Sequence, residues 1–235
     1  MGWQLENTSQ GQATAWDYND TNIQGPTSLN NIVPVRSENL RPPHLMLDET
    51  LSGIFGHLWF VDKIIKKDYK NGQISLVDDV PDENISILPL NRNEASNTGF
   101  AALDVEISGE VHPLLLQTGG FVHLSAEFSD SFRHSWLPVG YISESIYTKW
   151  TNENDWLVLR NGDYFYESDI IRAEHIRMGD ITVPFAWFAV REDAVFEEHF
   201  SEWSGLKISG TLGAGVFSGR TIYLDISGKK LGISN

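Results

Sequence analysis

The chain has 235 residues, 41% of them hydrophobic and 11% aromatic, so it is long enough to bury a core as one large β domain or as two lobes. Acidic residues exceed basic ones by 15, a charge that repels nucleic-acid backbones and anionic lipid surfaces. The absence of cysteine excludes disulfides and thiolate metal sites, and no run of about 18 apolar residues predicts a membrane-spanning helix. We therefore expect neither nucleic acid nor a membrane span.

The N-terminal residues 1–31 are rich in Asn, Thr, Gln, Gly and Ser, with scattered aromatic residues. Such a composition is typical of loops and turns or of marginal strands, and we expect irregular structure there. A first β-rich unit follows over residues 32–78. The acidic, proline-containing stretch 78–83 interrupts it, because proline and clustered charge oppose a continuing central strand, and a linker to about residue 98 is predicted.

A block near residue 55 recurs near residue 212 at a constant offset of 157 residues. Each copy contains an apolar strand ending in glycine, a short apolar turn, a β-rich run, a polar turn and a final strand, which predicts a duplicated β half-domain. The matching residues are Gly53, Gly56, Asp68, Asn71, Ile74 and Leu76 in the first copy and Gly210, Gly213, Asp225, Gly228, Leu231 and Ile233 in the second.

A β-hairpin with a buried second strand is predicted between the two copies. Residues 103–107 alternate apolar and acidic side chains, Ser108-Gly109 forms a turn, and residues 111–116 run apolar into Gln-Thr-Gly-Gly at 117–120. A later aromatic hairpin is predicted over 156–166, where Asn161-Gly162 would supply the positive φ angles of its turn. Helical periodicity is weak, with the best short candidate at 193–203, so the predicted class is mainly β.

These motifs resemble the two-lobe bacterial aspartyl proteases related to retropepsins and pepsin. Residues 114–120 are similar to the apolar strand that leads into Asp-Thr-Gly in that family. Ile54-Phe55-Gly56 and Thr211-Leu212-Gly213 are similar to the strand that packs behind this loop, with Gly56 and Gly213 in structural positions. The resemblance implies a pepsin/retropepsin-like acid-protease fold with a partial first lobe (1–98) and a complete second lobe (99–235). It also favours a periplasmic or secreted location.

The chain departs from the family pattern at the catalytic position. The family's chemistry needs two carboxylates that share one proton, whereas Gln117 has an amide that takes no proton from water. Thr118 would hold the loop through its hydroxyl group, and Gly119 would allow close approach of the backbone. At the same offset the first-lobe motif would precede Met1, and Asp20-Thr21-Asn22 is the nearest string. That aspartate is absent by evolution, removed by processing, or supplied by another chain.

The predicted function is a protein that has lost peptidase activity and binds an extended peptide or protein by strand addition. The alternatives are an aspartic endopeptidase seen as a processed or inactivated chain, and a structural subunit completed by another chain or a second copy. The resemblance implies that Trp156, Tyr164 and Tyr166 form a flap over the cleft; the alternative for them is surface packing. We interpret the Gln117 loop as a former catalytic loop that keeps a ligand-binding role; the alternative is a plain hairpin turn after a buried strand. No cofactor and no metal ion are expected.

Overall fold

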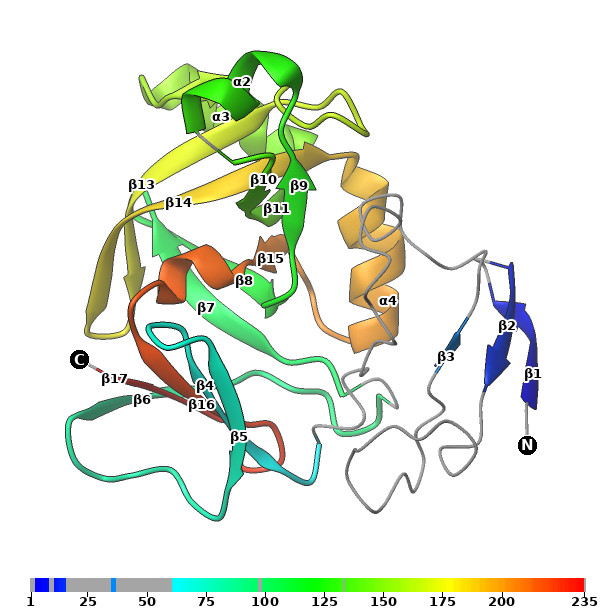
Figure 1. Ribbon diagram of the computed structural model, residues 1–235, viewed down its shortest axis with the longest axis vertical. Coiled ribbons are helices and arrows are strands. Elements are labelled where there is room, and N and C mark those ends of the chain that lie inside the picture. Colours follow the sequence, from blue (N-terminus) through cyan, green and yellow to red (C-terminus); the bar gives the residue numbers. More distant parts are fainter. Residues whose placement is uncertain are drawn as a thin grey trace. The chain divides into compact units, whose positions relative to one another are not determined.

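The structure is a computed structural model in which the chain divides into two compact units, residues 1–60 and 61–235 (Figure 1). In the first unit three strands are described, and they form an antiparallel sheet of their own: β1 (Trp3–Thr8), β2 (Gly11–Ala15) and β3 (Val35–Arg36). Residues 61–96, 99–132 and 134–234 are described in the second unit. The irregular structure expected for residues 1–31 is thus wrong at β1 and β2, where Thr8 pairs with Gly11 to form a hairpin.

A closed β-barrel is the main feature of residues 61–235. Six strands close it in the order β13-β14-β11-β15-β8-β7, and β13 returns to β7 where Arg177 pairs with Glu106. They are β7 (Ala102–Ile107), β8 (Glu110–Leu116), β11 (Gly140–Ser143), β13 (Ile170–Met178), β14 (Ile181–Arg191) and β15 (Gly210–Leu212). A short strand, β12 (Val158–Leu159), adds to β13. The mainly β class predicted from the sequence is confirmed.

The hairpin between β7 and β8 forms as predicted, because its turn residues have the geometry that the strand twist requires. Ser108 and Gly109 both have positive φ angles, 54° and 79°, which suits a two-residue turn between twisted antiparallel strands. Leu114 and Leu115 of β8 are buried. The second strand of this hairpin therefore lies in the core.

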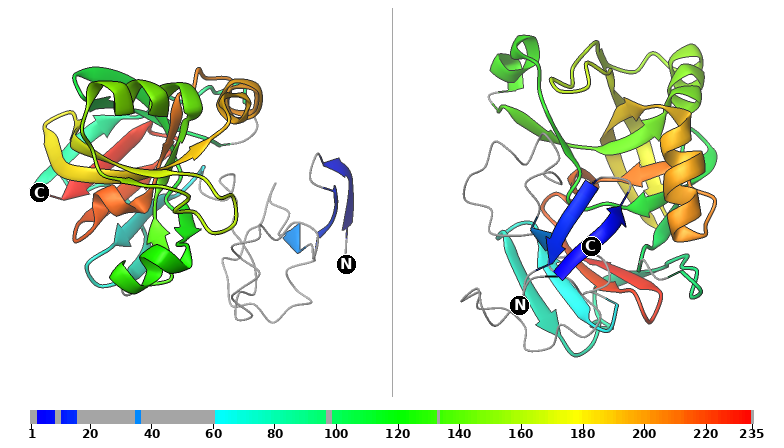
Figure 2. Two further views of the ribbon diagram at one scale, coloured as in Figure 1. Left: turned by 90° about the horizontal axis from the view of Figure 1, so that it is seen from above. Right: turned by 90° about the vertical axis from the view of Figure 1, so that its right-hand side faces the viewer.

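A second sheet joins two hairpins that lie far apart in the sequence. Its order is β5-β4-β16-β17-β6, and Figures 1 and 2 show the cyan β4–β5 pair beside the red β16–β17 pair. Its strands are β4 (Ile64–Asp68), β5 (Gln73–Val77), β6 (Ile85–Pro89), β16 (Thr221–Asp225) and β17 (Lys230–Ser234). β16 and β17 begin and end 157 residues after β4 and β5.

The two hairpins are related by a local two-fold axis. Lys66 of β4 pairs with Tyr223 of β16, and these two residues are themselves separated by the 157-residue offset. The other pairs are arranged symmetrically about them, from Ile64 with Asp225 to Asp68 with Thr221. β6 lies in the segment predicted to be a linker. That prediction is wrong over these five residues, because Ile85–Pro89 pair with β17 along its whole length.

Short helices and a two-stranded sheet surround the barrel. They are β9 (Phe121–His123), α2 (Ala126–Phe132), β10 (Trp136–Pro138), α3 (Glu144–Glu153), the π-helical η3 (Val195–Phe200), α4 (Ser201–Ser204) and the 3₁₀-helical η4 (Ala214–Phe217). η3 and α4 occupy the segment predicted to be helical. Among the described residues, no helix has the length and apolar character to cross a membrane.

Candidate functional site

The loop that follows β8, residues 117–120, lies where two parallel strands end side by side. β8 pairs with β15 in parallel, with Leu116 opposite Leu212. The backbone N–H of Gln117 donates to the carbonyl oxygen of Leu212 at 3.0 Å, and the N–H of Gly120 donates to that of Gln117 at 2.9 Å. The structure therefore brings the Gln-Thr-Gly-Gly loop and the Thr211-Leu212-Gly213 segment together, although almost a hundred residues separate them.

Close backbone approach at this point requires glycine. A Cβ atom added at Gly213 would lie 2.1 Å from the carbonyl oxygen of Val139, and one added at Gly120 would lie 2.6 Å from the same atom. Both separations are far below van der Waals contact with backbone atoms that have no freedom to move away. Gly119, in contrast, is exposed and has open space at its Cβ position. Gly56 lies outside the described residues.

A polar side chain of the loop accepts a hydrogen bond from a lysine. The Lys67 ammonium of β4 donates to the Thr118 hydroxyl oxygen at 2.6 Å. Burial lowers the pKa of Lys67. Gln117 is half-buried, and its Oε1 atom is buried without a hydrogen-bond partner, an unusual state for a strong acceptor. Gln117 therefore places an uncharged acceptor next to the Lys67–Thr118 pair. The family resemblance implies a carboxylate at this position.

Tyr69, just beyond β4, completes this cluster. Its ring stacks on Phe217 at 6.0 Å between centroids. Burial raises the pKa of Tyr69 to about 12, although the neighbouring Thr118 hydroxyl acts in the opposite direction. Tyr69 is therefore a neutral phenol at physiological pH, and the cluster offers hydroxyl, amide and ammonium groups rather than a pair of carboxylates.

A wall of stacked side chains extends from this loop toward a groove. The ring of Tyr141 lies 3.5 Å from the Cβ position of Gly120, and its hydroxyl donates to the carbonyl oxygen of Phe121 at 2.9 Å. The Arg191 guanidinium lies between two rings, 4.7 Å from the Tyr141 centroid and 4.1 Å from that of Tyr166. Burial raises the pKa of Tyr141 to about 12.

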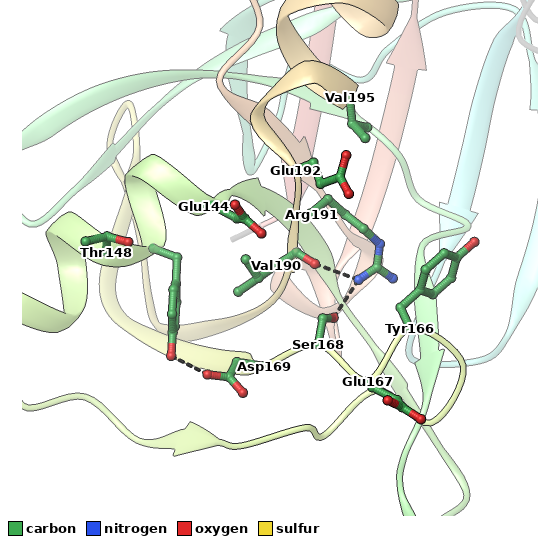
Figure 3. Close-up of a pocket in the computed structure, with 11 residues that line it drawn as sticks. Glu144, Thr148, Tyr166, Glu167, Ser168, Asp169, Val190, Arg191, Glu192 and Val195 are labelled. Carbon is green, nitrogen blue, oxygen red and sulfur yellow. Dashed lines mark hydrogen bonds between the residues drawn. The ribbon is translucent and has the colours of Figure 1, made fainter.

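Arg191 is held rigidly in this stack. Its Nη2 atom donates to Asp163 at 2.6 Å, and the Asp163 side chain is only 1% exposed. Its Nη1 atom donates to the Ser168 hydroxyl at 2.8 Å and to the Val190 carbonyl at 2.7 Å (Figure 3). A buried carboxylate with a charged, hydrogen-bonded partner is costly to disturb, so the stack is a fixed part of the site.

The groove beyond Arg191 has a volume of about 670 Å³. Figure 3 shows side chains that line it. Tyr147 and Asp169 lie on its wall, and the Tyr147 hydroxyl donates to Asp169 at 2.5 Å. Burial alone would raise the pKa of Asp169, but hydrogen bonds from Tyr147, the Asn161 backbone and Arg160 together hold it below the usual value. Asp169 is therefore a carboxylate at neutral pH.

The predicted aromatic flap is wrong as a hairpin. Val158 and Leu159 pair with Ile171 and Ile170 of β13, and residues 164–166 form a turn rather than a returning strand. Asn161 has the expected positive φ of 50°. β12 nevertheless pairs with β13, which is part of the long β13–β14 ladder.

The three predicted flap residues differ in their contacts and exposure. Trp156 packs edge-to-face on the buried Trp150, 5.5 Å between centroids. Tyr164 and Tyr166 are 62% and 54% exposed. Of the three, only Tyr166 lines the groove, against Arg191. Tyr141 and Arg191, which join the groove to the loop, were missed because neither belongs to a local motif.

Some solved structures are similar in fold to this chain. No protein-family model and no curated protein matches the sequence. A retropepsin-like aspartic protease from Rickettsia conorii aligns with 64% of this chain and 90% of its own, at 12% identity and a TM-score of 0.38. Basic 7S globulin from soybean aligns with 82% of this chain and 60% of its own, at 10% identity and a TM-score of 0.41.

Proposed function

We propose that this protein is an aspartyl-protease-like binding module that has lost peptidase activity and holds an extended peptide or protein segment at the Gln117 loop. The observation that carries the proposal is the polar content of that loop: an amide at position 117 and a Lys67–Thr118 hydrogen bond of 2.6 Å. An amide does not take a proton from water, and an ammonium group has no lone pair to do so. These groups support recognition rather than hydrolysis.

The unsatisfied Oε1 atom of Gln117 supports a peptide ligand. A buried acceptor without a partner costs free energy, and a peptide N–H is a matching donor. An extended ligand that runs from this loop past Tyr141 would reach the groove beside Arg191 and Tyr166. Such a ligand would gain main-chain hydrogen bonds at the loop and side-chain contacts in the groove.

Peptide-library cleavage between about pH 3 and about pH 7 tests the loss of activity. We expect no cleavage by the unmodified chain. We also expect none by Gln117→Asp, because one carboxylate beside Lys67 lacks the shared-proton partner. Asn152→Asp, the same amide-to-carboxylate change at an exposed position of α3, is the matched control. Cleavage by the unmodified chain would refute the proposal and support the aspartic endopeptidase alternative.

Peptide binding is measured separately by affinity selection of extended peptides followed by fluorescence anisotropy. Removing the acceptor by Gln117→Ala is expected to weaken binding about tenfold, whereas Asn152→Ala on α3 is expected to leave it unchanged. Selected peptides that bind the wild type and Gln117→Ala equally would place the binding surface elsewhere.

A second candidate function, a structural subunit completed by another chain, has its own supporting observation. Ile74 and Leu76 of β5 are 71% and 50% exposed, which is unusual for two large aliphatic side chains on one strand. Size measurements of the purified chain, alone and with partners, distinguish this function from peptide binding at the loop.

A further inference from the structure

The strand β5 lies at the edge of the five-stranded sheet. Among the described strands it pairs with β4 alone, and residues 73–76 are all exposed. Its sequence, Gln-Ile-Ser-Leu-Val, contains no charged residue and no proline, the usual features that keep sheet edges from pairing with other strands. The opposite edge of the same sheet, β6, ends in Pro89.

The local two-fold axis shows what the β5 edge lacks. β17 corresponds to β5, and its outer edge is occupied by β6 in antiparallel pairing. Leu231 and Ile233 of β17 are fully buried, whereas the corresponding Ile74 and Leu76 are exposed. In the second copy of the repeat, β17 therefore accepts the uncharged, mostly aliphatic strand β6 in antiparallel pairing. In the first copy, β5 has no such partner among the described residues.

We propose that β5 is a self-association edge, at which two copies of this chain pair β5 with β5 in antiparallel orientation about Ser75. In this register Ile74 faces Leu76 of the other copy and Gln73 faces Val77, so the exposed aliphatic side chains meet one another twice. The interface is isologous, since the same strand contributes to both sides. This inference goes beyond peptide binding at the Gln117 loop and does not depend on it.

Charge favours a second copy over an arbitrary strand. Lys70 precedes β5, and Asp78 and Asp79 follow it; all three are exposed. Antiparallel pairing about Ser75 brings Lys70 of each copy beside the two aspartates of the other. Two sets of opposite charges then flank an uncharged centre, although the net charge of −15 per chain opposes association. A five-residue contact is small, so we expect a weak dimer with a micromolar dissociation constant.

Sedimentation equilibrium of the full chain from about 1 to about 200 µM tests the dimer. Leu76→Lys should weaken dimerisation at least tenfold, and Ile87→Lys on the exposed face of β6 is the matched control that should not. Lys70→Glu alone should also weaken it about tenfold. A mixture of Lys70→Glu with an Asp78→Lys, Asp79→Lys double variant should restore association as a heterodimer.

Cysteine cross-linking tests the register, and the absence of native cysteine makes each result unambiguous. In the proposed pairing the two Ser75 Cα atoms lie about 4.5–5.5 Å apart, a separation that a disulfide bridges. Ser75→Cys should therefore cross-link with itself on oxidation. Ile74→Cys should instead cross-link with Leu76→Cys when the two variants are mixed.

Three results would overturn the proposal. The first is a monomer at every concentration, which would mean that β5 takes a strand of another protein or none. The second is a dimer that Leu76→Lys and Lys70→Glu leave unchanged, which would place the interface elsewhere. The third is preferential self-cross-linking at a position other than 75. Circular dichroism of each variant confirms folding, so that loss of the dimer is not mistaken for unfolding.

Discussion

The two hairpins of the five-stranded sheet have the same strand lengths and turns built alike, yet their side chains have different surroundings. Asp68 accepts a hydrogen bond from the backbone of Asn71 at 3.0 Å, and Asp225 accepts the corresponding bond from Gly228 at 2.7 Å. On the final strand of each hairpin, however, Ile74 is 71% exposed and Leu231 is fully buried. Similar local sequences therefore give the two hairpins the same shape, while the rest of the fold decides how much each hairpin contributes to stability.

The largest expected difference between the hairpins lies in these aliphatic side chains. Leu231→Ala should lower the free energy of unfolding by about 2–5 kcal/mol, because it leaves a cavity in a packed core. Ile74→Ala should change it by no more than about 0.5 kcal/mol, because the side chain is already in water. Urea unfolding at a single protein concentration measures both. Equal effects would mean that Ile74 is covered.

The turn of the second hairpin should show an intermediate effect. Asp225→Ala removes the 2.7 Å hydrogen bond to Gly228 and should cost about 1–1.5 kcal/mol of unfolding free energy. Asp68→Ala should cost at least as much, since Asp68 accepts three hydrogen bonds from Lys70 and Asn71 in a turn that is equally exposed. Asp225→Asn, which keeps the accepting oxygen, is the control for charge. If it is as harmful as Asp225→Ala, charge rather than the hydrogen bond holds this turn.

The left-handed residues of the two turns provide a smaller test. Gly72 has a φ of 65° and corresponds to Lys229, whose φ is 52°. Gly72→Ala should destabilise by about 1 kcal/mol, and Lys229→Gly should stabilise by about 0.5 kcal/mol. The ion pair of Lys229 with Glu94 is exposed and offsets little of this gain. Thermal unfolding of both variants checks the opposite signs; a destabilising Lys229→Gly would contradict the reasoning.

The smallest expected effect is a dependence of stability on pH that arises at Asp68 in the first turn. The side chain of Asn71, and then its backbone, hydrogen-bond to Asp68 and lower the pKa of that carboxyl group. A lowered pKa in the folded state stabilises the protein above the ordinary aspartate pKa, and this contribution is lost as pH falls through the folded value. The urea midpoint of wild type minus that of Asp68→Asn should therefore shrink as pH falls below about 4. A difference that stays constant down to about pH 2 would contradict it.

Elements with a complete local signal were predicted well, and elements that depend on a distant partner were not. The β7–β8 hairpin was predicted from alternation and a Ser108-Gly109 turn, both contained in the fifteen neighbouring residues 102–116. The aromatic hairpin had a similar Asn161-Gly162 signal. It failed because Val158 and Leu159 found a better partner in β13, which no local pattern reveals. β6 was missed for the same reason: acidic residues and a proline precede it, and its partner β17 lies more than 140 residues away.

Sequence alone determined the mainly β class, the 157-residue offset between the two strand–turn–strand units, and the presence of an amide rather than a carboxylate at position 117, because each depends on residue type and spacing. Only the tertiary structure decided that Lys67 donates to Thr118, that Tyr141 and Arg191 join the loop to a groove, and that Ile74 is exposed where Leu231 is buried. These features depend on which strands become neighbours, and that depends on burying the whole set of apolar faces at once rather than on any local pattern.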